Sequence, residues 1–394
     1  METPIEEPSE QPQGFSDSPE PATLGPQLSF RAPVEGLLSY SAGRSARDVR
    51  KAGHWAGSPA ALAANETPYG PFPNVLSAVQ RNAANVNRYP ESGFGVLREQ
   101  LAKHLSLPLT RVAAAAGGTS VIHHVSLALL EPGDEVIQCS PTFHLYALDA
   151  QKLGARTVSV RVAADGRYDL EAMRSKIGGR TRLIYVCNPN NPTGGIVRRN
   201  ELLQFVRSVP AHVAILIDEA YFEYVDDPEY PDTARDPAFH LPNLVTLRTF
   251  SKAYGLAGLR VAYTAGEPRI IAALRKLQND YEVTSLSQAA AIASLENTDE
   301  LERRRALNRT GRAALVAGLQ NLGYSPLPSH GNFVCVRVGA AKEFAAALEG
   351  RGVIVRPLNA MGDPASIRIT VGTDSEISQA IEAIAALSTI ALCP

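Results

Sequence analysis

The sequence predicts an α/β protein, with a large domain built on a mainly parallel sheet covered by helices and a smaller α+β domain after it. Apolar runs of strand length alternate with amphipathic stretches of helix length through most of the chain, as in sheets covered on both faces. Beyond about residue 322 the segments become shorter and more mixed. A chain of 394 residues is long enough for a large core.

The strand candidates are apolar runs that end in polar, Gly or Pro residues. A long helical pattern covers residues 298–322, and three short segments follow at 332–338, 352–356 and 366–371. The six clearest strand runs of the large domain are 134–140, 156–162, 182–187, 213–217, 244–248 and 260–264.

Four regions are expected along the chain. Residues 1–30 are rich in Pro, Glu and Ser, so we expect a disordered tail that cannot offset the entropy of ordering. Residues 31–75 form an N-terminal arm that joins the small domain. The large domain covers residues 76–290, and the small C-terminal domain covers residues 291–394.

Composition argues against several classes of partner. The 38 Lys and Arg residues nearly balance the 40 Asp and Glu residues, so no basic field favours nucleic acid. No run of about 20 apolar residues predicts a membrane span, and the first residues do not resemble a signal peptide. We therefore expect a cytoplasmic protein that acts on small molecules.

No metal site is expected. His123 and His124 are adjacent on a predicted helix, so their side chains diverge by about 100 degrees. The four cysteines also lack the close spacing of zinc sites or redox pairs, at Cys139, Cys187, Cys335 and Cys393.

Chemically useful residues follow three of the predicted strands, in the segments 188–194, 218–221 and 249–252. Ligands bind at the carboxyl ends of the strands in open parallel sheets. Lys252 is preceded by Thr249 and Ser251 and followed by Arg260, and these groups are suited to phosphate. Nearby positive charge and desolvation would favour a neutral, imine-forming amine, although a solvated surface lysine is the alternative.

Asp218 ends the apolar run AILID, where a buried carboxylate needs a partner. The ring nitrogen of pyridoxal phosphate is such a partner, because the carboxylate keeps it protonated. Helix capping or magnesium binding is the alternative. Asn191, in the stiff turn CNPNNPTGG, is a candidate donor to the phenolic oxygen of that cofactor, or only part of a turn.

Taken together, CNPNNPTGG, IDEAYFEY and RTFSKAYGLAGLR resemble, in order and spacing, the fold-type I aminotransferases that depend on pyridoxal phosphate, particularly the histidinol-phosphate aminotransferase branch. The similarity extends from about residue 38 to 387. It implies that Lys252 forms the Schiff base and acts as general acid and base, and that Asp218 holds the ring nitrogen. It also implies that Asn191 and Tyr221 hold the phenolic oxygen.

The resemblance implies further cofactor contacts. Phe143, in SPTFHLY, would stack on the ring, although it could also be a core residue. Backbone amides of Gly118, Thr119 and Ser120, in GGTS, would bind phosphate at a helix N-terminus. Related enzymes usually have an acidic pair at positions 119 and 120, and this chain does not. The remaining phosphate ligands would be Thr249, Ser251 and Arg260.

Two tyrosines imply a homodimer with shared active sites. Tyr89 resembles the tyrosine that reaches the phosphate of the neighbouring subunit's cofactor, and Tyr40 resembles a residue of the N-terminal arm near that subunit's substrate. An ordinary surface or interface role is the alternative for both.

The substrate residues are also implied by the resemblance. Arg368 matches the arginine that binds the substrate carboxylate, with Arg356 as a second positive contact and Asn65 nearby; a surface salt bridge is the alternative for either arginine. The segment LQNDYEVTS departs from the branch, because Glu282 adds a negative charge near a site meant for phosphate. This departure argues against histidinol phosphate as the best donor.

We therefore expect an aminotransferase that moves an amino group from a histidinol-phosphate-like amine, or an aromatic or specialised amino acid, to a 2-oxo acid such as 2-oxoglutarate. The alternatives are a decarboxylase, cyclase or oxidase with the same cofactor, or a cofactor-binding protein without turnover.

Overall fold

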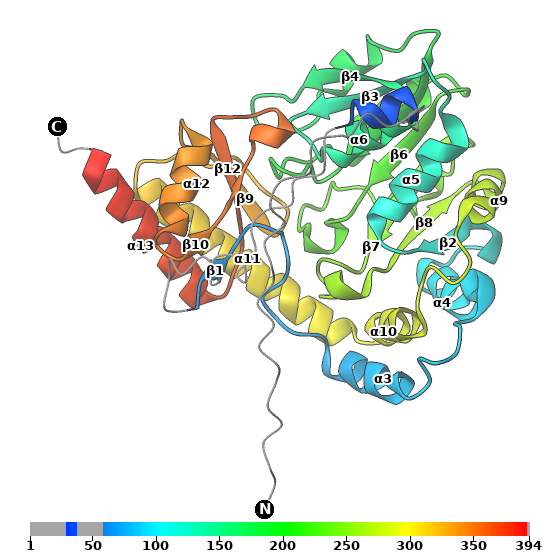
Figure 1. Cartoon of the computed structure of the whole chain (residues 1–394), viewed down its shortest axis with the longest axis horizontal. Coiled ribbons are helices and arrows are strands. Elements are labelled where there is room, and N and C mark those ends of the chain that lie inside the picture. Colours follow the sequence, from blue (N-terminus) through cyan, green and yellow to red (C-terminus); the bar gives the residue numbers. More distant parts are fainter. Residues whose placement is uncertain (1–28, 38–57, 392–394) are drawn as a thin grey trace, which may run out of the picture.

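A seven-stranded sheet lies at the centre of the larger part of the protein (Figure 1). The computed structural model describes residues 29–37 and 58–391. The strand order is β2-β8-β7-β6-β5-β3-β4. Most of the expected tail, and Tyr40, lie outside the described residues. The strands of this sheet are β2 (Val112–Ala115), β3 (Glu135–Ser140), β4 (Arg156–Arg161), β5 (Thr181–Cys187), β6 (Ala214–Asp218), β7 (Leu244–Thr249) and β8 (Ala262–Gly266).

The sheet is parallel except at β8, which pairs antiparallel with both β7 and β2. Only residues 250–261 join β7 to β8, and they contain one 3₁₀ turn, Ala257–Leu259. This link contains no α-helix that could cross over the sheet, as parallel neighbours usually require, and the chain turns back along β7. All six predicted runs contain strands, whereas the Ala-rich β2 was not among them because alanine has low strand propensity.

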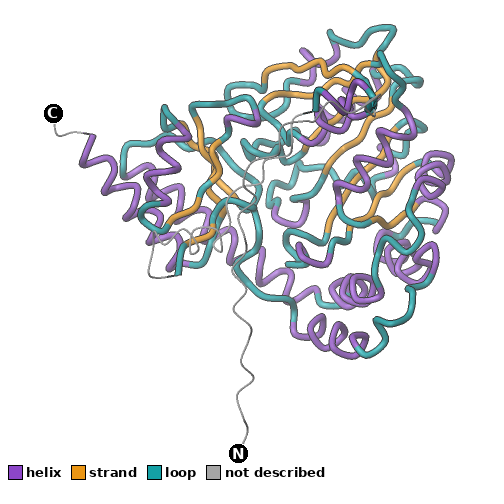
Figure 2. Tube along the Cα trace, in the orientation of Figure 1, coloured by secondary structure: helices purple, strands orange, loops and turns teal. Residues whose placement is uncertain are grey.

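Helices cover both faces of this sheet (Figure 2). Successive residues of β2 face opposite sides, so Ala113 joins an apolar core with α5, α6, α8 and α9, and Ala114 joins another with α3, α4 and α10. The helices up to residue 295 are α1 (Ala32–Glu35), α3 (Pro73–Ala83), α4 (Gly95–Leu105), α5 (Gly118–Leu129), α6 (Leu145–Lys152), α7 (Leu170–Arg174), α8 (Arg199–Ser208), α9 (Pro268–Leu277) and α10 (Ser285–Leu295).

The C-terminal part has its own apolar core and an antiparallel sheet of order β11-β12-β9. It begins with the long helix α11 (Thr298–Asn321), close to the predicted range. The short β1 (Ala60–Ala61), which precedes the large sheet in the chain, lies in this part and pairs with β10. The other elements are β9 (Phe333–Arg337), α12 (Ala341–Glu349), β10 (Val353–Ile354), β11 (Arg356–Pro357), β12 (Ser366–Thr370) and α13 (Asp374–Ala391).

The expected division into an arm, a large domain and a small domain remains a prediction. No helix within residues 29–37 and 58–391 is both long and apolar enough to cross a bilayer. The same residues contain no group of three His, Cys, Asp or Glu side chains that could hold a metal ion.

The pairing of β5, β6 and β7 sets the position of the site. Cys187 lies opposite Asp218, and Asp218 lies opposite Leu247. The segments that follow these parallel strands therefore emerge at one edge of the sheet, where ligands bind in open α/β folds.

Candidate active site

A cavity of about 540 Å³ lies at this edge and is also lined by residues of the C-terminal part. It brings together most of the residues that the sequence singled out. The predicted residues in its lining are Asn65, Gly118, Thr119, Phe143, Asn191, Asp218, Tyr221, Thr249, Ser251, Lys252, Arg260, Arg356 and Arg368.

Lys252 reaches the cavity from the segment after β7. Its Nζ donates hydrogen bonds to the backbone oxygens of Asn65 at 3.0 Å and Ala64 at 3.3 Å. Burial, together with the positive charges of Arg368 and Arg260, lowers the pKa of Lys252 to about 8. Part of the population is therefore a neutral amine near pH 7, the form that attacks a carbonyl carbon.

Asp218 ends β6 and is 4% exposed. Its Oδ2 accepts a hydrogen bond from the Tyr146 hydroxyl at 2.7 Å, and its Oδ1 accepts one from the Ala220 amide at 3.0 Å. Burial raises the pKa of Asp218, while these two donors and the charge of Lys252 oppose that rise. A buried carboxylate held in this way is suited to bind a cationic ring nitrogen.

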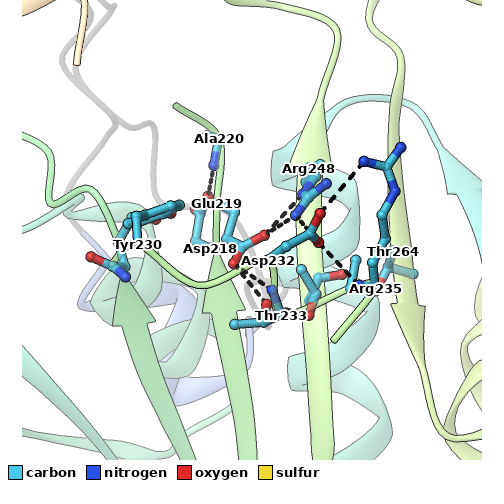
Figure 3. Close-up of polar contacts among 12 residues, drawn as sticks. Asp218, Glu219, Ala220, Tyr230, Asp232, Thr233, Arg235, Arg248 and Thr264 are labelled. Atoms are coloured by element: carbon cyan, nitrogen blue, oxygen red, sulfur yellow. Dashed lines mark hydrogen bonds and ion pairs between the residues drawn. The ribbon is translucent and has the colours of Figure 1, made fainter. Parts of the chain in front are cut away.

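The next residue, Glu219, points toward Arg248 and Thr233 (Figure 3). Its carboxylate forms an ion pair with Arg248 at 2.7 Å and accepts a hydrogen bond from the Thr233 hydroxyl at 2.7 Å. Arg248 also pairs with Asp232 at 2.7 Å. Arg248 lies on β7, the strand that leads to Lys252, so the pair ties together the strand ends that carry the carboxylate and the amine.

The C-terminal part contributes two arginines on adjacent strands. Arg356 of β11 lies opposite Arg368 of β12, and both line the cavity. Arg368 donates to Oδ1 of Asn191 and to the backbone oxygen of Ala63, each at 2.5 Å. Burial and these two arginines lower the pKa of His144 to about 4, so His144 is neutral at pH 7. This end of the cavity therefore favours an anionic substrate group.

Asn65 connects the arm to the same end of the cavity. Its Nδ2 donates to the Tyr221 hydroxyl at 2.9 Å, and its Oδ1 accepts from Thr370 at 3.1 Å. Asn332 donates to its backbone oxygen at 3.1 Å. These bonds fix the oxygen that also accepts from Lys252.

The opposite end is built for a phosphate-like anion. Gly118 and Thr119 begin α5, where unpaired amides and the helix dipole attract negative charge. Gly117 has φ +88°, and a Cβ there would lie 2.5 Å from the Arg260 guanidinium. Only glycine therefore lets Arg260 approach this turn. Thr249 donates to the Ser251 hydroxyl at 3.0 Å, which brings both hydroxyls to the cavity wall.

Residues 60–384 match the family described as "Aminotransferase class I and II". The chain belongs to this aminotransferase family. It is 41% identical over 346 residues to an aromatic amino acid aminotransferase of Streptomyces avermitilis, covering 87% of this chain and 93% of the relative. It is 38% identical over 356 residues to histidinol-phosphate aminotransferase 1 of Cupriavidus pinatubonensis, covering 89% and 94%.

A solved structure shares the fold of this aminotransferase. The histidinol-phosphate aminotransferase of Sinorhizobium meliloti, determined in complex with pyridoxal 5'-phosphate, superimposes with a TM-score of 0.82 and 28% identity. The alignment covers 92% of this chain and 98% of that one. The predicted family, enzyme class, fold class, aminotransferase function and cofactor, pyridoxal 5'-phosphate, are thus confirmed.

Three residues that the sequence assigned to the site of this aminotransferase do not line the cavity. The Ser120 hydroxyl points to Glu282 Oε2 at 3.4 Å. Glu282 is buried against the start of α5, so its placement does not support the predicted substrate contact. Tyr89 is 82% exposed and stacks on Tyr281, with 4.6 Å between ring centroids. Its predicted contact with a neighbouring subunit remains a prediction, and Tyr40 lies outside the described residues.

Sequence reasoning missed Tyr146, which donates the hydrogen bond to Asp218. Tyr146 is fully buried and stacks on Tyr185, so its sequence signal equals that of any core aromatic. The available clue was its spacing: Tyr146 lies three residues after Phe143, and their rings meet edge to face at 5.5 Å.

Proposed function

We propose that this aminotransferase binds pyridoxal 5'-phosphate covalently through Lys252, and that Asp218 holds the ring nitrogen of the cofactor. One observation carries the proposal: a single cavity contains an amine with a pKa lowered to about 8 and a buried carboxylate at neighbouring strand ends. The amides at the start of α5 and Arg260 fit the phosphate group. The residues present therefore fit this cofactor.

The remaining contacts follow from the cavity lining. Thr249 and Ser251 would donate hydroxyl hydrogen bonds to the phosphate, together with Gly118 and Thr119. Phe143 would cover one face of the ring. The further cofactor ligands are Asn191 and Tyr221, which would hold the phenolic oxygen.

When bound, the cofactor supplies an electron sink for the bond that breaks at the substrate carbon. Lys252 would act as the general base and acid for the proton of that carbon, a role that its lowered pKa permits near neutral pH. Tyr146 and Ala220 would stabilise the ionised form of Asp218, because both donate hydrogen bonds to its carboxylate. Arg368 would hold the substrate's anionic group at the cavity wall.

We propose an aromatic amino acid as the amine donor and a 2-oxo acid such as 2-oxoglutarate as the acceptor. The Streptomyces avermitilis relative is named for aromatic amino acids, and the paired Arg356 and Arg368 suit a carboxylate. Histidinol phosphate is the second candidate, because the same two arginines suit a phosphate. Decarboxylation, cyclisation, oxidation and a non-catalytic role are not favoured by the family.

A cytoplasmic homodimer with shared sites is also proposed. Tyr89 and Tyr281 form an exposed aromatic pair that a second subunit could cover. The buried, unpaired thiols Cys139, Cys187 and Cys335 are compatible with a reducing compartment.

The cofactor proposal is tested by adding pyridoxal 5'-phosphate to the full chain, reducing with borohydride and mapping the labelled peptide. The label is expected on Lys252, and Lys252→Ala should abolish amino transfer while the protein stays folded. Lys152→Ala is the matched control, because that side chain is half exposed and outside the cavity. Labelling of another lysine would refute the assignment. A spectral screen of amine donors then ranks aromatic amino acids against histidinol phosphate.

A further inference from the structure

Glu282 is a buried carboxyl group at the start of α5. Its side chain is 6% exposed. Oε1 accepts a hydrogen bond from the Ala116 amide at 3.2 Å, and Oε2 accepts one from the Ser120 hydroxyl at 3.4 Å. The carboxyl group thus bridges both ends of the turn that carries Gly118 and Thr119 into the cavity.

The segment that carries Glu282 is fixed at this position by its own backbone and by a neighbour. Tyr281 adopts the left-handed conformation with φ 63°, and Gln278 donates to the backbone oxygen of Ala114. The first turn of α5 contains no acidic side chain of its own. Glu282 therefore supplies, from a segment distant in sequence, the acidic group that a helix N-terminus favours.

Among the described residues, His124 is the basic side chain within ion-pair distance of Glu282. His124 of α5 lies 3.6 Å away, but burial lowers its pKa to about 4, so it is neutral at pH 7. His123, also on α5, is paired with Asp149 of α6 at 3.0 Å. Asp280 precedes it on its own segment, and Arg260 packs on Gly117 beside the same turn.

We propose that Glu282 is a positioning residue for the phosphate-binding turn, and that its carboxyl group takes up a proton when the cofactor's phosphate dianion binds. This inference rests on the proposed function, in which the phosphate of pyridoxal 5'-phosphate binds at the start of α5. An ionised Glu282 carboxylate and a phosphate dianion that both contact the start of α5 repel each other. A protonated carboxyl group keeps its contacts without that repulsion.

The direction of the pH dependence follows. Burial already raises the pKa of Glu282 above its ordinary value, and a bound dianion would raise it further. Above the pKa of the free protein, binding must therefore take a proton from solvent. Relative to a variant without this group, the wild type should lose affinity by up to about tenfold per pH unit in that range.

Cofactor binding by calorimetry tests this in two buffers of different ionisation enthalpy, which counts protons taken up per molecule of pyridoxal 5'-phosphate. Glu282→Gln keeps an acceptor oxygen for Ala116 but cannot titrate. Glu282→Gln should take up fewer protons than the wild type on binding the cofactor. Its affinity for the cofactor should exceed that of the wild type by a margin that grows as pH rises. The matched control is Glu267→Gln, because Glu267 also caps a helix, accepting from Arg269 at 2.7 Å, but lies outside the cavity.

Glu282→Ala separates positioning from charge, because it removes both hydrogen bonds and should bind the cofactor about tenfold more weakly than Glu282→Gln. Equal proton counts and parallel affinity profiles for wild type and Glu282→Gln would overturn the proposal. A folded Glu282→Gln variant that binds no cofactor would also overturn it. So would a Glu282→Ala variant that binds the cofactor as tightly as Glu282→Gln. If the wild type itself binds no pyridoxal 5'-phosphate, the proposed function fails instead.

Discussion

The phenol of Tyr146 donates a 2.7 Å hydrogen bond to Oδ2 of Asp218, in the interior of the protein. Tyr146 is completely buried, and its ring lies 4.6 Å from that of Tyr185 in a stacked pair. The stack fixes the phenol, so the donor does not need to reorganise when Asp218 carries its charge. Tyr146 is thus a positioning residue for the carboxylate that we expect to hold the cofactor's ring nitrogen.

Replacing this donor should shift the pH profile of amino transfer. Burial raises the pKa of Asp218 and the Tyr146 hydrogen bond lowers it, so Tyr146→Phe should raise that pKa. A hydrogen bond to a charged group contributes about 1.5–3 kcal/mol, or roughly one to two pH units. The acidic limb of the kcat profile should move to higher pH by this amount.

Tyr185→Phe is the matched control for Tyr146→Phe. Tyr185 lies in the same stack, but its hydroxyl bonds to Ser126 at 2.6 Å and not to Asp218. The acidic limb of the kcat profile of Tyr185→Phe should stay at the pH of the wild type. Identical shifts in the two variants would mean that packing, and not the hydrogen bond, governs Asp218.

The sequence predicted the sheet and most of the cavity because both depend on local patterns. Asp218 and Lys252 follow apolar runs, and parallel strands bring such positions to one edge. The antiparallel direction of β8 and the place of Glu282 depend on tertiary packing, which no local pattern records. Tyr146 was missed for the same reason, since a buried tyrosine in a core and one that supports a site have the same periodicity.

The buried ion pair of Glu219 with Arg248 should be important for stability. Both side chains are at most 1% exposed, and the guanidinium also stacks 3.3 Å from the Phe222 ring centroid. Removing one partner leaves an uncompensated buried charge, so Arg248→Met should lower the free energy of unfolding by about 3–5 kcal/mol. Urea denaturation measures this loss.

Surface pairs provide the comparison for Arg248→Met. Arg174 pairs with Glu171 at 2.5 Å, but both side chains are more than half exposed. Arg174→Met should therefore cost less than about 1 kcal/mol. If the two variants lose similar stability, the buried pair does not tie the strand ends as we infer.

Arg368 should be specific for the geometry of its substrate group. Its guanidinium already donates to Asn191 and to Ala63, so its position in the cavity is fixed. A lysine cannot reproduce the planar fork, and Arg368→Lys should raise KM for an amino acid donor about tenfold or more. Steady-state kinetics with an aromatic amino acid test this, with Arg337→Lys, on the exposed end of β9, as control. An unchanged KM would place the substrate's anionic group elsewhere.

Asp218→Asn should retain the cofactor but lose most amino transfer. The amide oxygen can still accept from the Ala220 backbone amide, and the amide NH2 can donate to the Tyr146 hydroxyl, so both contacts persist with the second one reversed. The Asn amide carries no charge, however, and cannot keep the ring nitrogen protonated, so the electron sink weakens and kcat should fall by at least about a hundredfold. Visible absorbance measures retained cofactor, and single-turnover kinetics with an amine donor measure the chemical step. Because Asn and Asp have nearly the same shape, a loss of cofactor would assign Asp218 to binding, whereas near-normal turnover would exclude it from the reaction.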